Sequence, residues 1–216
     1  MPEILYLHGF ASGPQSRKGA FFARQFHQIG WNVHQPDLNQ GDFKGLTLTR
    51  QVSAALRLAH EIRPEIVMGS SLGGYVAAIC GSIEPKLIPA LVLMAPAFGF
   101  ARRWSERLGE PAIEQWREKG AMDVYHYGEG RMAEIGYQFY EDALWFSDTP
   151  DVRQPTLIFH GKRDDVVSPE ASVQFAWGRP NVQVELLDSD HGLTDALEIM
   201  WTETVAWRGR LPGIRA

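Results

Sequence analysis

The chain has 216 residues, of which 44% are hydrophobic and 11% aromatic, enough for one domain with a substantial core or one domain carrying an insert. Its 21 basic and 26 acidic residues give a net charge of −5. Without a run of Lys and Arg, this composition argues against non-specific nucleic-acid binding and a polybasic membrane patch. No stretch approaches the roughly 20 apolar residues of a membrane-spanning helix, and the first residues lack a secretory-signal pattern. The single cysteine, Cys80, excludes an internal disulfide, so we expect a soluble cytoplasmic protein.

Short apolar runs alternate with longer amphipathic segments, the pattern of repeated strand–helix units. The expected strands, in chain order, are Glu3–Leu7, Trp31–Gln35, Glu65–Met68, one within Leu87–Met94, Pro155–Phe159 and Val182–Leu187. The expected helices are Ser16–Ile29, Leu46–Ile62, Leu72–Ile83, Pro169–Trp177 and Thr194–Trp207. Runs such as ALVLM and PTLIF are apolar on successive residues, which is typical of strands covered on both faces. We therefore expect a mainly parallel sheet of about six strands between two helix layers, followed by an irregular tail over Arg208–Ala216.

The segment Ala97–Pro150 departs from this rhythm, because its 54 residues exceed what a strand-to-strand crossover needs. It holds 11 of the chain's 24 aromatic residues and is dense in charge, which predicts amphipathic helices rather than strands. One interpretation is an extra helical layer whose aromatics pack on the core. The other, which we favour, is a helical cap over the active site, with aromatics lining an apolar pocket.

Gly69-Ser70-Ser71-Leu72-Gly73 matches the G-x-S-x-G pattern of a nucleophile elbow. An expected strand precedes it and an expected helix follows it, which is the strand–turn–helix setting that the motif requires. The turn is so tight that only glycine fits two residues before and two after the serine. We therefore expect Ser71 to be a catalytic nucleophile, with Ser70, in the x position, as its rival.

A serine hydroxyl is a weak nucleophile at neutral pH and needs a base. In such folds the chain order is serine, acid, histidine, with the histidine on the loop after the last strand. Among seven histidines, only His191 meets this requirement. The acid follows the preceding strand, where Asp164 fits the usual D-x-V-V pattern better than its neighbour Asp165. The acid would hold the imidazole tautomer and stabilise the imidazolium.

Acyl transfer also needs donors for the tetrahedral oxyanion. The backbone N–H of Leu72, immediately after the nucleophile, is the first expected donor. The second is the N–H of Phe10, on the loop after the first strand, where His8-Gly9 lets the backbone approach closely.

The remaining chemistry-bearing residues have plainer interpretations. Cys80 lies inside the elbow helix and is expected to be a small buried hydrophobe. The other histidines lack the close spacing of metal ligands, so no metal site is expected. Lys18, near a helix start, is either a solvated lysine or a contact for an anionic substrate.

Over nearly its whole length the chain resembles the α/β-hydrolase superfamily, and within it the YqiA-type serine esterases. The residues that carry this resemblance are Tyr6–Phe10, Ser12–Pro14, Ser16–Ala20 and the elbow Gly69–Tyr75. The resemblance implies a small serine hydrolase of acyl esters or thioesters without a cofactor, on a sheet that lacks the first two antiparallel strands of larger relatives. Related thioesterases that remove fatty acyl groups from proteins share a similar elbow, so ester and thioester both stay open.

The predicted function is therefore hydrolysis of a small-molecule carboxylic ester or thioester by Ser71, His191 and Asp164. A C–C hydrolase or a peptidase would use the same three residues. A non-catalytic binding protein is the alternative from another class. The intact set of three argues against it, since drift in a binding protein would break one member.

Overall fold

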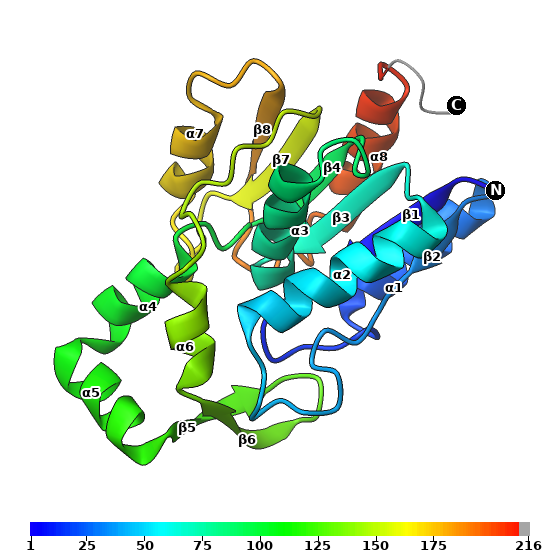
Figure 1. The fold of residues 1–216 in the computed structure, drawn as a ribbon. Helices are drawn as coiled ribbons and strands as arrows, with labels where there is room; N and C mark the ends of the chain where they lie inside the picture. The colour runs from blue at the N-terminus through cyan, green and yellow to red at the C-terminus, as the bar shows by residue number, and fades with distance from the viewer. Residues whose placement is uncertain (212–216) are drawn as a thin grey trace.

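A six-stranded parallel sheet forms the centre of the molecule in the computed structural model, which describes residues 1–211 (Figure 1). In spatial order the strands are β2 (Asn32–His34), β1 (Glu3–Leu7), β3 (Ile66–Ser70), β4 (Leu91–Met94), β7 (Thr156–Gly161) and β8 (Val182–Leu187). All neighbouring pairs are parallel. The expected strands are confirmed, with ends that differ by a few residues at most sites. The expected tail beyond residue 211 lies outside the described residues.

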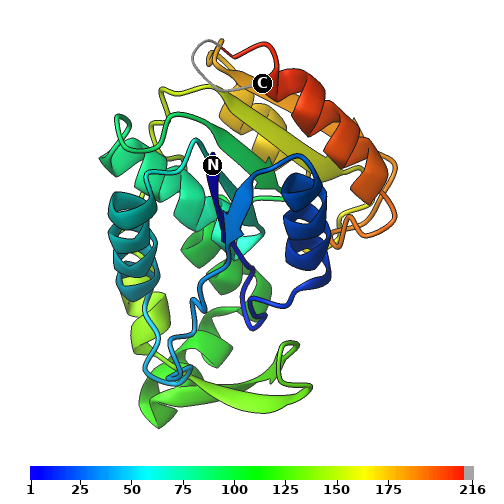
Figure 2. The ribbon, with the colours of Figure 1, turned by 90° about the vertical axis from the view of Figure 1, so that its right-hand side faces the viewer.

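Helices cover both faces of this sheet, as the continuous apolar strands predict. One face carries α1 (Arg17–Gln28) and α8 (Leu197–Arg208), and the other carries α2 (Leu48–Ile62), α3 (Leu72–Ile83) and α7 (Glu170–Ala176) (Figure 2). Alternate residues of β1 divide between the two cores: Ile4 and Tyr6 pack toward α1, whereas Leu5 and Leu7 pack toward α2 and α3. Because successive side chains of a strand point to opposite faces of the sheet, β1 contributes residues to both hydrophobic cores.

The strand order reverses direction at β1. From β1 the chain runs outward to β2, then returns to place β3 on the other side of β1, where Leu7 pairs with Gly69. The loops that follow β1 and β3 therefore part to opposite faces and leave a crevice at the carboxyl edge of the sheet. Both the expected nucleophile and one expected oxyanion donor lie on these two loops.

The long insert follows β4 and precedes β7 in the chain. In space it lies beyond the carboxyl edge of the sheet (Figure 1). It consists of α4 (Phe100–Leu108), α5 (Glu110–Lys119), β5 (Ala121–His126), β6 (Arg131–Gly136) and α6 (Gln138–Ala143). The segment contains three helices, as expected, but the expectation that it holds no strands is wrong, because β5 and β6 form an antiparallel hairpin.

The hairpin has a physical cause that is visible in its sequence. Met122, Val124 and His126 alternate with exposed residues along β5, which is the period of a half-buried strand. His126 is buried at the end of β5, where its ring contacts the Asn39 amide and accepts the Glu129 N–H. Two glycines in the intervening turn, one of them at positive φ, then reverse the chain.

Hydrogen bonds join the insert to the loops at the carboxyl edge. The N–H of Gly128 donates to Ala11 O after β1, and the N–H of Gly136 donates to Lys44 O after β2. Asp142 accepts from both the N–H and the hydroxyl of Thr49 at 2.7 Å.

No helix within residues 1–211 is long and apolar enough to cross a membrane.

Candidate active site

Ser71 lies at the sharp turn between β3 and α3, with φ of 52° and ψ of −117°. A non-glycine residue in this region stores about 1–3 kcal/mol of strain, which the surrounding turn must offset. A Cβ placed on Gly69 would lie 2.3 Å from Gly73 O, and one placed on Gly73 would lie 2.2 Å from Leu7 O. Both positions therefore require glycine, as the sequence motif predicts.

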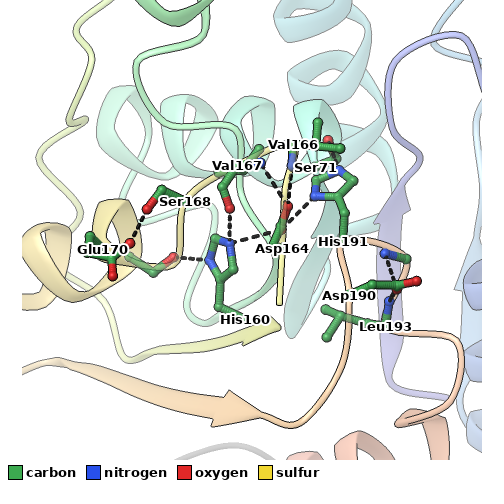
Figure 3. A network of polar contacts seen from close by, with 12 residues as sticks. Ser71, His160, Asp164, Val166, Val167, Ser168, Glu170, Asp190, His191 and Leu193 are labelled. Atoms are coloured by element: carbon green, nitrogen blue, oxygen red, sulfur yellow. Dashed lines mark hydrogen bonds and ion pairs between the residues drawn. The ribbon is translucent and has the colours of Figure 1, made fainter. Parts of the chain in front are cut away.

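The structure brings Ser71, His191 and Asp164 into one hydrogen-bonded chain (Figure 3). The hydroxyl oxygen of Ser71 lies 3.0 Å from Nε2 of His191, and Nδ1 of the same ring lies 2.7 Å from Oδ2 of Asp164. The geometry assigns the Nδ1–H tautomer to His191, because Nδ1 must donate to the carboxylate. Nε2 is then free to accept the serine proton, which is the arrangement of a base beside a nucleophile.

Asp164 is held as a carboxylate in a buried position. Its Oδ1 accepts the N–H groups of Val166 at 2.9 Å and Val167 at 2.8 Å. Burial alone would raise the pKa of Asp164, but hydrogen bonds from His160, His191 and the Val167 N–H outweigh burial and hold that pKa well below its usual range. The acid of the chain is thus ionised throughout the neutral range.

His160 contacts the candidate acid Asp164, and the sequence analysis did not single it out. Its side chain is fully buried in β7, with Nε2 at 3.1 Å from Asp164 Oδ2 and 2.8 Å from Val167 O (Figure 3). Nδ1 lies 2.7 Å from the hydroxyl of Ser172. The Nε2–H therefore donates toward two oxygens while Nδ1 accepts from Ser172. The only signal in the sequence is its position four residues before Asp164.

Phe10 and Leu72, the two expected oxyanion donors, line the same cavity as Ser71. Leu72 is the first residue of α3, where a helical N–H has no acceptor within the helix. A Cβ on Gly9 would lie 3.4 Å from Ser71 Cβ, so the loop after β1 touches the elbow and the next residue, Phe10, lies beside it. The Phe10 ring packs with Trp104 and Phe139 of the insert at centroid distances of 5.3 and 5.5 Å, which fixes this loop.

The two rival residues lie outside the hydrogen-bonded chain. Ser70 is buried at the end of β3, and no bond joins it to His191 within residues 1–211. Asp165 is exposed, whereas Asp164 faces His191. Cys80 is buried, as expected. No cluster of three or more His, Cys, Asp and Glu side chains in the described part of the chain is arranged to hold a metal ion.

A cavity of about 700 Å³ opens above Ser71 and His191. Loops at the sheet edge form one side of it, and the insert forms the other with Phe100, Trp104, Tyr125 and other residues. The insert's aromatics divide between two roles, because Trp116 and Phe139 are fully buried in the core while Trp104 and Tyr125 face the cavity. A space of this size accommodates a small-molecule substrate.

Comparisons with known proteins agree with this fold. Human palmitoyl-protein thioesterase ABHD10, a mitochondrial protein, is 27% identical over 216 residues, covering 92% of this chain and 69% of its own. The solved structure of alpha/beta hydrolase domain-containing protein 10 from mouse matches with a TM-score of 0.78 at 21% identity, covering 95% of this chain and 89% of that one. Est1E from Butyrivibrio proteoclasticus with bound ferulic acid gives a TM-score of 0.72 at 20% identity, with 95% and 90% covered.

Fold and relatives together define the chain as a hydrolase enzyme of the α/β-hydrolase superfamily, and the expected superfamily is confirmed. More narrowly, the chain belongs to the uncharacterised protein family UPF0227, whose model matches residues 3–204.

Proposed function

We propose that this chain is a serine hydrolase that cleaves carboxylic ester or thioester bonds through an acyl-enzyme intermediate. The observation that carries the proposal is the hydrogen-bonded chain from Ser71 through His191 to Asp164, on a strained elbow at the floor of a cavity. Each role needs its own geometry: a nucleophile within reach of a base, and a base oriented by an ionised acid. The geometry of Ser71, His191 and Asp164 is consistent with both requirements.

The reaction begins when Ser71 Oγ attacks the acyl carbonyl and its proton passes to Nε2 of His191. Asp164 stabilises the imidazolium that forms, because its carboxylate accepts from Nδ1 at 2.7 Å. When the tetrahedral intermediate collapses, the imidazolium gives the proton to the departing alcohol or thiol. Water then attacks the acyl-enzyme, His191 takes its proton, and the carboxylic acid leaves as Ser71 is restored.

The N–H groups of Leu72 and Phe10 act as the oxyanion donors in this proposal. The Leu72 N–H lies at the positive end of the α3 dipole, which favours negative charge on the reacting oxygen. Phe10 is fixed by its packing against Trp104 and Phe139. Loss of one such donor lowers turnover by about 10²–10³.

The insert acts as a cap that shapes the acyl-binding space. Phe100, Trp104 and Tyr125 supply apolar lining, which suits an acyl chain or an aromatic acyl group. The relatives named as palmitoyl-protein thioesterases support an acyl thioester as one form of substrate. The same relatives are named as mitochondrial; for this chain, the cytoplasm stays our prediction, which cell fractionation would test.

The direct test is hydrolysis of p-nitrophenyl esters from acetyl to palmitoyl by the wild type and by Ser71→Ala. We expect ester hydrolysis that falls by at least about 10³-fold in the variant, with unchanged circular dichroism. Ser70→Ala is the matched control and should lose less than about tenfold, because no bond joins Ser70 to His191. Equal activity of Ser71→Ala and wild type would refute the proposal.

A panel of other substrates separates the alternative reactions on the same residues. Peptides and C–C bonded diketones should stay intact at enzyme concentrations that hydrolyse the esters. Turnover of either class in preference to every ester and thioester would reassign the reaction.

A further inference from the structure

The cavity above Ser71 is lined by four cations and by no acidic side chain within the described residues. The cations are Arg17, Lys18, Arg103 and Arg107. None of them forms an ion pair in residues 1–211, and the one polar contact among them is the hydrogen bond from Lys18 Nζ to Gly192 O at 2.6 Å. An excess of positive charge therefore faces the space where the substrate binds.

The arginines elsewhere on the insert behave differently. Arg102 pairs with Asp148 at 2.9 Å and with Glu106 at 3.0 Å, Arg117 pairs with Glu114, and Arg131 pairs with Glu129. These guanidinium groups lie at the surface and have carboxylate partners. Arg103 and Arg107, the arginines of the insert that face the cavity, form no ion pair with a carboxylate in the described residues.

Among these four cations, Arg103 is the one with a buried donor, its Nε, that has no hydrogen-bond partner in the described part of the chain. Burial first, and the like charge of Arg102 second, lower the pKa of the Arg103 guanidinium. The charges of Asp164, Asp148 and Glu106 oppose this lowering of the pKa, and the arginine remains protonated at neutral pH. Arg103 also lines the cavity, so its guanidinium is a partly buried cation without an ion pair in residues 1–211, and an anionic group of a ligand there would compensate its charge. Arg107 lies one turn further along α4 on the same side and faces the same cavity.

We propose that Arg103, assisted by Arg107, binds an anionic group of the substrate, a carboxylate or a phosphate, and so selects charged acyl esters over neutral ones. The planar guanidinium matches the oxygens of either group with two parallel hydrogen bonds. Phe100 and Trp104 line the same cavity, and apolar side chains beside a charge-assisted contact strengthen it. The substrate is then an amphipathic ester with an apolar part and one anionic group; this inference rests on the proposed hydrolase function.

Two matched pairs of esters test it and distinguish the sources of charge. Mono-p-nitrophenyl suberate and p-nitrophenyl octanoate differ only by a carboxylate at the end of the acyl chain. 4-Phosphonooxyphenyl octanoate and 4-methoxyphenyl octanoate differ by a phosphate on the leaving group. We expect the wild type to prefer the charged member of one pair by at least about tenfold in kcat/KM, as expected for one charge-assisted contact. The pair that responds identifies which part of the substrate carries the charge.

Arginine variants locate the preference. Arg103→Gln should bring the charged-to-neutral ratio to within about threefold of one, Arg107→Gln should lower it partly, and Arg103→Lys should restore part of it. Arg117→Gln is the control, since this arginine of the insert pairs with Glu114 and does not line the cavity. It should keep the wild-type ratio. A ratio of one or less in both pairs for the wild type, or an unchanged ratio in the Arg103→Gln/Arg107→Gln double variant, would overturn the inference.

Binding to Ser71→Ala separates this inference from the reaction itself. Isothermal titration with each ester pair needs no turnover, and the charged member should bind at least about tenfold more tightly, an advantage that Ser71→Ala/Arg103→Gln loses. Charge-selective binding without hydrolysis by the wild type would refute the hydrolase and keep the anion site. Hydrolysis by the wild type, with equal binding of the charged and neutral esters, would keep the hydrolase function and refute the anion site.

Discussion

His160 Nε2 lies 3.1 Å from Oδ2 of Asp164, the same carboxylate oxygen that accepts the hydrogen bond of His191. One oxygen thus receives two imidazole donors, one from the core and one from the solvent side. The buried ring is fixed in turn by Ser172 and by Val167 O. Asp164 is therefore oriented by an inner histidine while it orients the outer one.

Replacing His160 should weaken turnover without removing it. Loss of its hydrogen bond raises the pKa of Asp164 from its lowered position and frees the carboxylate to rotate. We expect His160→Gln to lower kcat/KM for p-nitrophenyl esters by about tenfold at pH 7, and by more at pH 5. His60→Gln, at an exposed histidine that pairs with Glu84, is the control and should match wild type. A pH profile of His160→Gln that overlays the wild-type curve would show that His160 has no positioning role.

Asp164→Asn should lower turnover by about 10⁴-fold, because an amide favours the wrong imidazole tautomer of His191. Asp165→Asn should lose less than about threefold, since that side chain is exposed and makes no contact with His191. Both variants are measured on one ester at pH 7.5. The reverse order of effects would move the acid to Asp165.

The lowered pKa of Asp164 predicts that part of the free energy of unfolding depends on pH. Its pKa is lowered in the folded state, so its contribution is complete above the unfolded value of about 3.9 and declines as pH falls from there toward the folded value. Urea unfolding of wild type and Asp164→Asn at pH 7 and pH 3 measures it. The free energy of unfolding of the wild type should exceed that of Asp164→Asn by more at pH 7 than at pH 3. A constant difference between the two proteins would mean that the carboxyl has the same pKa in both states.

Gly73→Ala should destabilise the fold by more than about 2 kcal/mol, because the new Cβ would meet Leu7 O at 2.2 Å and His8 O at 2.4 Å. Gly13→Ala is a matched control, since nothing lies within 4 Å of a Cβ there and its φ is not positive. Thermal unfolding compares the two. If Gly73→Ala melted at the same temperature as Gly13→Ala, the turn at Ser71 would tolerate a Cβ at position 73, which contradicts the close contacts in the structure.

The sheet and the candidate triad were predictable because each depends on local patterns. Continuous apolar runs indicate strands buried on both faces, and the residues that follow successive parallel strands meet at one edge. Ser71, Asp164 and His191 each follow a strand in the required order, so their meeting needed no knowledge of packing. Glycine at 69 and 73 reflects sterics within a single turn.

The insert was less predictable because its pattern is weaker. Six-residue strands such as β5 and β6 give few alternations, and the charges on their exposed sides suggest an amphipathic helix equally well. The alternation around Met122 and Val124, followed by a turn with two glycines, was the signal that pointed to a hairpin.

Arg103 and His160 could not be recognised from the sequence alone. Whether an arginine on an amphipathic helix faces solvent or a cavity depends on how the insert packs, and that is decided by distant contacts such as Phe10 with Trp104. His160 reads as one more residue of an apolar strand. Its partners Ser172 and Val167 reach it only through the fold.

The most direct measurement is labelling of the wild-type protein with a fluorophosphonate, followed by mass spectrometry of the peptides. Only a serine activated by a neighbouring base reacts readily with this reagent. We predict one adduct, on Ser71, that is absent from Ser71→Ala and strongly slowed in His191→Ala. An unlabelled wild-type protein, or an adduct on Ser70, would contradict the assignment of Ser71 as the nucleophile.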